Sequence, residues 1–182
     1  MDEEKRFLTI PNILTILRIM ILPFVIYYIT QDVYYYQKTI FILLGIQGLT
    51  DFLDGIIARK LKQISSLGKI LDPLADKLTF DSIMIALLKY DFPLFIVILL
   101  LSRDIVIIFS GYSIFKKKKV IPVSNIWGKI STFSLVVYLI SFIGGIEYLK
   151  SIFFYILLIS ITISGITYFI YFLKIYIRSN NE

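Results

Sequence analysis

Six apolar stretches of near-bilayer length constrain the fold of this chain more than any other feature. They lie at residues 11–30, 37–60, 71–90, 92–115, 124–145 and 150–175. A helix needs about 20 mostly apolar residues to cross the hydrocarbon core, since each residue adds about 1.5 Å. With 58% hydrophobic and only 18% charged residues, the composition also departs from that of soluble domains. The sequence therefore predicts an all-α integral membrane protein with six transmembrane helices.

The N-terminal residues do not resemble a cleaved signal peptide. Residues 2–4 are acidic, and the apolar stretch that follows contains Arg18 and no small-residue cleavage site. We therefore expect a retained first helix, preceded by a short amphipathic juxtamembrane segment at residues 7–10. The length of 182 residues favours a single membrane domain over residues 1–182.

Two missing residue types narrow the possible chemistry. The chain has no cysteine, which excludes disulfides, zinc–thiolate sites and cysteine nucleophiles. It has no histidine either, so a general base must be a carboxylate, a lysine, a tyrosine or water. A metal site would be built mainly from oxygen ligands, which favours Mg²⁺, Mn²⁺ or Ca²⁺. Nucleic acid is not an expected partner, because no soluble basic domain accompanies the apolar stretches.

Basic residues are distributed unevenly over the connections between the apolar stretches. They gather at residues 59–69, at residues 116–119 and near both ends of the chain, whereas the other connections contain few. Because basic residues stay on the cytoplasmic side of a membrane, we expect both termini to face the cytoplasm from the cell (inner) membrane. The formal net charge of +6 would then face anionic membrane lipids.

Four aspartates lie close together in this apolar chain. Asp51 and Asp54 are spaced i, i+3, and Asp72 and Asp76 are spaced i, i+4, so each pair shares one face of its helix. The short connection between the two helices predicts that they are antiparallel neighbours, which would bring the four carboxylates together near the cytoplasmic side. Such carboxylates repel one another. Two bound divalent cations, Mg²⁺ or Mn²⁺, would remove the repulsion and suit phosphoryl displacement.

The neighbours of these aspartates leave alternatives open. Gly55 and Ala58 are small enough for a phosphate or another helix to approach. Arg59 could pair with an aspartate or hold a phosphate. The aspartates could instead form plain salt bridges with Arg59, Lys69 and Lys77, or line a path for divalent-cation transport. No acidic ladder continues through the last two apolar stretches, which argues against transport.

The spacing D-x2-D-G-x2-A-R-x8-G-x3-D-x3-D is matched in full by residues 51–76. It resembles the signature of the CDP-alcohol phosphotransferase family. This resemblance implies a six-helix membrane fold, usually a homodimer, with a dinuclear metal site, a CDP-linked donor and release of CMP. It implies that Asp51, Asp54, Asp72 and Asp76 hold metal, and that Asp76 is the catalytic base that deprotonates the acceptor hydroxyl. The CDP and diphosphate would be bound by Asp51, Asp54, Gly55, Ala58, Arg59 and Gly68.

Three further segments resemble the bacterial phosphatidylglycerophosphate synthase branch of that family. They are IPNILTILRIMILP (10–23), LLSRDIVI (100–107) and WGKIST (127–132). This branch implies CDP-diacylglycerol as donor and glycerol 3-phosphate as acceptor. The sequence departs from this branch in two places. After SRDIVI, residues 109–111 stand where a Leu-Arg pair is frequent, and Ile130 stands where a basic residue is common. The SRD segment is also similar to cardiolipin synthases, so phosphatidylglycerol stays an alternative acceptor, as does inositol phosphate.

Two isolated cations are candidates for binding a phosphorylated acceptor. Arg103 lies among apolar residues of the fourth stretch, and Lys129 lies near the start of the fifth. Alternatively, Arg103 forms a buried pair with Asp104, Asp81 or a backbone carbonyl, and Lys129 only extends to the membrane interface.

A polar stripe is predicted on the first helix. Asn12, Thr15 and Arg18 recur at spacing i+3 in an otherwise apolar stretch. The stripe could face the headgroup of the donor, or Arg18 could bind only a lipid phosphate.

Overall fold

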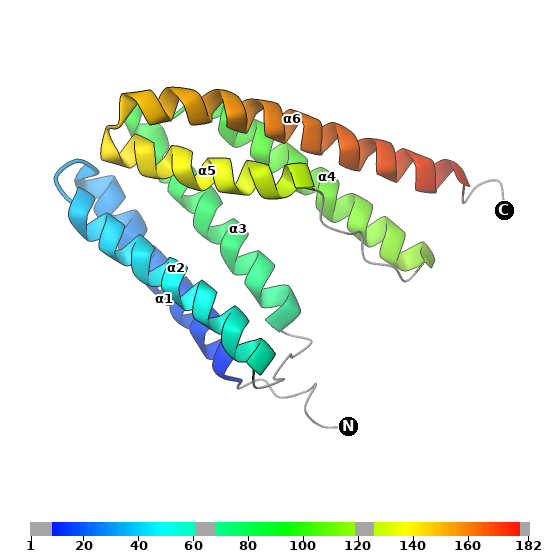
Figure 1. Ribbon diagram of the computed structural model, residues 1–182, viewed down its shortest axis with the longest axis horizontal. Coiled ribbons are helices and arrows are strands. Elements are labelled where there is room, and N and C mark those ends of the chain that lie inside the picture. Colours follow the sequence, from blue (N-terminus) through cyan, green and yellow to red (C-terminus); the bar gives the residue numbers. More distant parts are fainter. Residues whose placement is uncertain (1–8, 61–67, 119–125, 179–182) are drawn as a thin grey trace. The chain divides into compact units, whose positions relative to one another are not determined.

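The computed structural model describes residues 9–60, 68–118 and 126–178 (Figure 1). Over these ranges it contains six α-helices, one short 3-10 helix and no β-strand. The helices are α1 (Ile10–Asp32), α2 (Gln37–Lys60), α3 (Gly68–Leu87), η2 (Leu88–Tyr90), α4 (Leu94–Lys118), α5 (Ile126–Gly144) and α6 (Glu147–Arg178). The all-helical prediction is confirmed, and each observed α-helix begins and ends within a few residues of a predicted stretch.

The apolar character of the helices differs along the chain. In the described ranges, α1, α2, α5 and α6 are long and apolar enough to cross a membrane. The helix α3 is more polar, because five of its 20 residues are charged: Lys69, Asp72, Asp76, Lys77 and Asp81. The protein is thus an integral membrane protein by helix composition, with four spans supported where the sequence predicts six.

The helices form two compact units, Met1–Phe92 and Pro93–Glu182. In the first unit, α1 packs against both α2 and α3. In the second unit, α6 packs against both α4 and α5. The prediction that α2 and α3 are direct neighbours therefore needs correction for the described residues, since each makes its main contacts with α1. The cause is the buried polar face of α1, described below, which both helices cover.

One end of the first unit is closed by residues of η2. The hydroxyl of Tyr90 donates a hydrogen bond to the carbonyl oxygen of Ile29 at 2.9 Å and accepts one from the amide of Val33 at 3.1 Å. The Nζ atom of Lys89 donates to the carbonyl oxygen of Thr30 at 2.7 Å. Ile29 and Thr30 are among the last four residues of α1, whose carbonyl oxygens have no partner within the helix, and these bonds provide one. They fix the end of α1 to the segment that follows α3.

The turn between α5 and α6 depends on Gly145, which has a φ of +65°. The amide of Gly145 donates to the carbonyl oxygen of Phe142 at 3.3 Å, and the amide of Ile146 donates to the carbonyl oxygen of Ser141 at 2.9 Å. A left-handed residue that ends a helix in this way is usually glycine, because a Cβ atom would be strained there.

Replacement of Gly145 with alanine is expected to lower the free energy of unfolding by about 1 kcal/mol, since alanine is strained at this φ. Gly48→Ala in α2 is the matched control, because a Cβ at Gly48 would meet nothing within 4 Å and the residue is helical. Thermal unfolding of both variants in detergent checks this. Equal midpoints for the two variants would contradict it.

Candidate active site

A polar face on α1 is the base of the site. Asn12, Thr15 and Arg18 are exposed by only 2%, 0% and 2%, so the predicted stripe is buried within the protein. The hydroxyl of Thr15 donates to the carbonyl oxygen of Pro11 at 3.1 Å, which satisfies its hydrogen within the helix. The Arg18 guanidinium cannot be satisfied in that way, and a buried cation needs anionic partners.

Three carboxylates from two helices meet at the Arg18 guanidinium. Its Nη2 atom lies 2.7 Å from Oδ1 of Asp51 and 2.6 Å from Oδ2 of Asp54, both on α2. Its Nη1 atom lies 2.6 Å from Oδ1 of Asp76 on α3. The contacts with Asp54 and Asp76 are short, charge-assisted hydrogen bonds, and the contact with Asp51 is an ion pair. The side chain of Arg18 therefore connects α2 and α3 across α1.

The three carboxylates differ in exposure. The side chain of Asp54 is only 7% exposed, whereas those of Asp51 and Asp76 are 51% and 47% exposed. The cluster thus has a buried side at Asp54 and an accessible side at the other two aspartates. With all four groups ionised, it carries a net charge of −2. Such a cluster suits a cationic ligand that arrives from the accessible side.

Further polar groups surround Arg18. The Nε2 atom of Gln47 on α2 donates to the carbonyl oxygen of Arg18 at 3.0 Å. Five buried side-chain atoms of the described part have no hydrogen-bond partner: Nε of Arg18, Oε1 of Gln47 and Oγ1 of Thr79 in the first unit, and Oγ of Ser134 and Oγ of Ser164 in the second. Buried polar atoms are almost always paired in folded proteins. The three atoms of the first unit lie one each on α1, α2 and α3, the helices that Arg18 connects.

The other predicted residues of the motif are only partly described. Gly55 follows Asp54 on α2 and is half-buried. Ala58 and Arg59 belong to α2, and Gly68 and Asp72 belong to α3, but the surroundings of these four residues lie outside the described part of the structure. Metal and nucleotide binding by these four residues stays a prediction.

The carboxylates fit a divalent metal by their chemistry, because Mg²⁺ and Mn²⁺ prefer oxygen ligands and three of these groups already converge on one cation. Their present arrangement is organised around Arg18 instead. Within the described ranges, no three acidic side chains gather closely enough to hold a metal ion as they stand. The donor set is suitable, and the guanidinium lies at the point where the donors meet.

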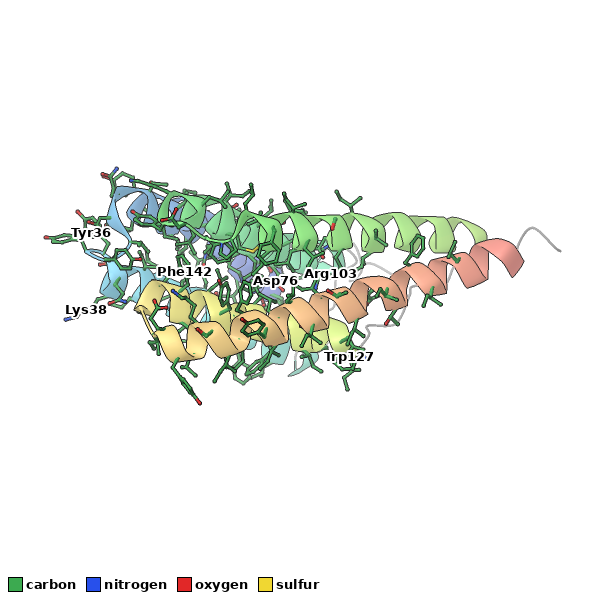
Figure 2. The ribbon with its side chains drawn as sticks, turned by 90° about the horizontal axis from the view of Figure 1, so that it is seen from above. Tyr36, Lys38, Asp76, Arg103, Trp127 and Phe142 are labelled. Atoms are coloured by element: carbon green, nitrogen blue, oxygen red, sulfur yellow. The ribbon has the colours of Figure 1, made fainter. Side chains whose placement is uncertain are left out.

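The candidate acceptor residues belong to the second unit, where Figure 2 labels Arg103 on α4. Nη2 of Arg103 lies 2.7 Å from Oδ1 of Asp104, and Nη1 donates to Oγ of Ser131 on α5 at 2.6 Å. The alternative that Arg103 pairs with Asp104 is therefore confirmed. Lys129 is exposed on α5. Acceptor binding by Arg103 and Lys129 stays a prediction.

The pairing of Arg18 with the aspartates is not predicted from the sequence. The expected structural partners of the aspartates are Arg59, Lys69 and Lys77, and the expected partners of Arg18 are the donor headgroup or a lipid phosphate. The i+3 stripe on α1 was the available signal, because a cation on the buried face of an apolar helix needs carboxylates. Ser131 and Gln47 were also missed, since a single small or amide side chain has no sequence signal of its own.

Comparisons with known proteins agree with the motif. The sequence model of the CDP-alcohol phosphatidyltransferase family matches residues 8–170. A CDP-diacylglycerol–glycerol-3-phosphate 3-phosphatidyltransferase of Aquifex aeolicus is 41% identical over 133 residues, which cover 69% of this chain and 70% of the relative. A protein of the same name from Rickettsia felis is 39% identical, with 68% of each chain covered. A cardiolipin synthase (CMP-forming) of Streptomyces coelicolor is 33% identical, with 73% of this chain and 64% of the relative covered.

Proposed function

This chain belongs to the CDP-alcohol phosphatidyltransferase family, and from that premise we propose that it makes phosphatidylglycerophosphate. It transfers a phosphatidyl group from CDP-diacylglycerol to glycerol 3-phosphate and releases CMP, as a step of phospholipid biosynthesis. The observation that carries this proposal is the convergence of Asp51, Asp54 and Asp76, all in the family motif, from two helices on one point. Relatives named for this reaction, at 41% and 39% identity, support the choice of acceptor.

Members of this family use a divalent metal. In this chain Asp51, Asp54, Asp72 and Asp76 would hold two such ions, Mg²⁺ or Mn²⁺. The bound metal supplies positive charge that neutralises the diphosphate of the donor. On the protein side, Gly55, Ala58 and Gly68 would line the nucleotide and diphosphate, because small residues let a phosphate approach the backbone. Arg59 binds a phosphate oxygen of the CDP group.

Asp76 is the residue that we assign as base. The acceptor hydroxyl attacks the lipid-side phosphorus, a new P–O bond forms, and the P–O bond to CMP breaks, so CMP leaves with the electron pair. The hydroxyl proton passes to the Asp76 carboxylate. A base must reach the proton that it removes, and the 47% exposure of the Asp76 side chain supports this role.

The membrane arrangement follows the distribution of charge. We propose that all six α-helices span the cell (inner) membrane, with Asp76 of α3 and the Arg103–Asp104 pair of α4 facing the protein interior. Both termini and the carboxylate cluster face the cytoplasm, where water-soluble glycerol 3-phosphate is available. The enzyme acts as a homodimer among membrane lipids, in keeping with the family resemblance.

Arg103 and Lys129 are proposed to bind the phosphate of the acceptor. Arg103→Ala is expected to raise the KM for glycerol 3-phosphate about tenfold, with a smaller effect on the KM for CDP-diacylglycerol, because a charged hydrogen bond contributes about 1.5–3 kcal/mol. Lys129→Gln should act in the same direction. Lys38→Gln, which removes an exposed charge at the start of α2, is the control. Equal effects on both KM values would contradict the assignment.

An acceptor panel tests the function itself. Purified protein with Mg²⁺ and CDP-diacylglycerol receives glycerol 3-phosphate, phosphatidylglycerol, serine or inositol phosphate, and CMP release is followed. We expect CMP with glycerol 3-phosphate. CMP with phosphatidylglycerol alone would establish the second candidate, a cardiolipin synthase, which the 33% identical relative favours. Metal flux into liposomes without CMP from any acceptor would instead indicate a cation transporter.

A further inference from the structure

We propose that Arg18 is an internal counter-ion that holds the carboxylate cluster in the metal-free protein, and that it leaves this position when a divalent cation binds. The inference rests on the proposed function, since it concerns the same metal-binding carboxylates. It assigns to Arg18 a role in setting metal affinity, as a positioning residue that does not itself take part in the chemistry.

The first argument is the location of the guanidinium. Asp51, Asp54 and Asp76 each place a carboxylate oxygen within 2.6–2.7 Å of it. No three described acidic side chains approach one another closely enough to hold a metal in this arrangement. The carboxylates thus surround a cation that the chain itself provides. A metal ion bound at the centre of the same three groups would occupy the place of the Arg18 guanidinium.

The second argument is that Arg18 does not use its full hydrogen-bonding capacity. Its Nη1 and Nη2 atoms contact the three carboxylates, but its Nε atom is buried without an acceptor. A guanidinium in its preferred site offers parallel donors to a planar anion and leaves few donors unused. With a side chain only 3% exposed, Arg18 is largely removed from bulk water, so an unused donor is costly. In this arrangement each of the three carboxylates has a cationic partner, whereas the arginine keeps one buried donor without an acceptor.

The third argument is charge. Three carboxylates and one guanidinium sum to −2, whereas three carboxylates and one divalent ion sum to −1. Replacement of Arg18 by the metal therefore neutralises the cluster more completely. In the absence of metal, the guanidinium provides a positive charge beside Asp54, whose side chain is only 7% exposed.

A different role for Arg18 predicts the opposite result. If Arg18 stayed in place and oriented the carboxylates around a bound metal, its removal would weaken metal binding. If it competes with the metal, its removal strengthens metal binding. The direction of the change in metal affinity therefore decides between the two roles.

The test measures Mn²⁺ binding directly, with no substrate present. Wild-type protein and Arg18→Gln are purified in detergent, stripped with EDTA and titrated with Mn²⁺, and free Mn²⁺ is followed by EPR. We expect the variant to bind Mn²⁺ at least about fivefold more tightly, the lower end of the usual range for coupled binding events. Lys89→Gln, which removes one exposed cation of the same unit, is the control and should leave the affinity unchanged. Unchanged or weaker binding by Arg18→Gln would overturn the inference.

A second variant protects the test against poor folding of Arg18→Gln. Arg18→Lys keeps the charge, but one ammonium group cannot reproduce the fork that bridges three carboxylates. It should also bind Mn²⁺ more tightly than the wild type and show a larger rise in unfolding temperature on addition of Mn²⁺. Equal rises in the variant and the wild type would contradict the inference and leave the proposed function intact. Failure of the wild type to bind any Mn²⁺ would overturn both.

Discussion

Replacement of Asp76 with asparagine is expected to lower the turnover number by about 10²–10⁴-fold, the usual contribution of a general base. Asparagine has nearly the same shape and keeps an oxygen that can accept from Nη1 of Arg18, so the local fold should survive. It cannot take up the proton of the acceptor hydroxyl. The measurement is CMP release with glycerol 3-phosphate, together with binding of CDP-diacylglycerol, which the variant should retain.

Asp91→Asn is the matched control for this substitution. Asp91 has a φ of 60°, in the left-handed region that asparagine also tolerates, and it is exposed after η2. The same chemical change there should leave turnover at the wild-type level. Undiminished turnover of Asp76→Asn would remove its assignment as base. Loss of CDP-diacylglycerol binding by Asp76→Asn would show that Asp76 acts in substrate binding, before the chemical step.

Replacement of Arg18 with glutamine in metal-free protein is expected to lower the free energy of unfolding by about 3–5 kcal/mol, the cost of removing one partner of a buried ion pair. The reason is that Arg18 is 2% exposed and is the cation shared by Asp51, Asp54 and Asp76. Without it, the carboxylates repel one another, and the buried Asp54 loses its ion pair with Arg18. Unfolding in detergent with EDTA present gives the measurement.

Arg103→Gln provides a graded comparison for this loss of stability. Arg103 pairs with one carboxylate, that of Asp104, and both side chains are 13% exposed. We expect a smaller loss than for Arg18→Gln, because one ion pair is broken in a more accessible place. A loss as large as that of Arg18→Gln would show that the number of carboxylates at Arg18 does not determine its contribution to stability.

Much of the fold could be predicted, because apolar length and turn-forming residues are local signals. The predicted stretch at residues 11–30 became Ile10–Asp32, and that at residues 124–145 became Ile126–Gly144. The number of spans was less predictable. Charged residues in α3 can either exclude a helix from a membrane or be buried inside a bundle, and hydropathy does not distinguish the two.

The packing order of the helices could not be predicted from their connections. A short connection between α2 and α3 favours neighbours, yet both helices pack on α1. The i, i+3 spacing correctly predicted that Asp51 and Asp54 share a face, since one nitrogen of Arg18 binds both. It could not predict which cation lies opposite that face. That depends on Arg18 of α1, which lies 36 residues before Asp54 in the chain.

Pro23 gives α1 a mechanical property that bears on Arg18. Proline has no amide hydrogen, so the carbonyl of Ile19 lacks its helical hydrogen bond, and α1 bends at this point most easily. Toward its C-terminal end, Tyr90 and Lys89 anchor the helix at Ile29, Thr30 and Val33. Toward its N-terminal end lies Arg18. The segment of α1 before Pro23, which carries Arg18, can therefore move with a change at the carboxylates. The segment after Pro23 stays in place, because Tyr90 and Lys89 hold it.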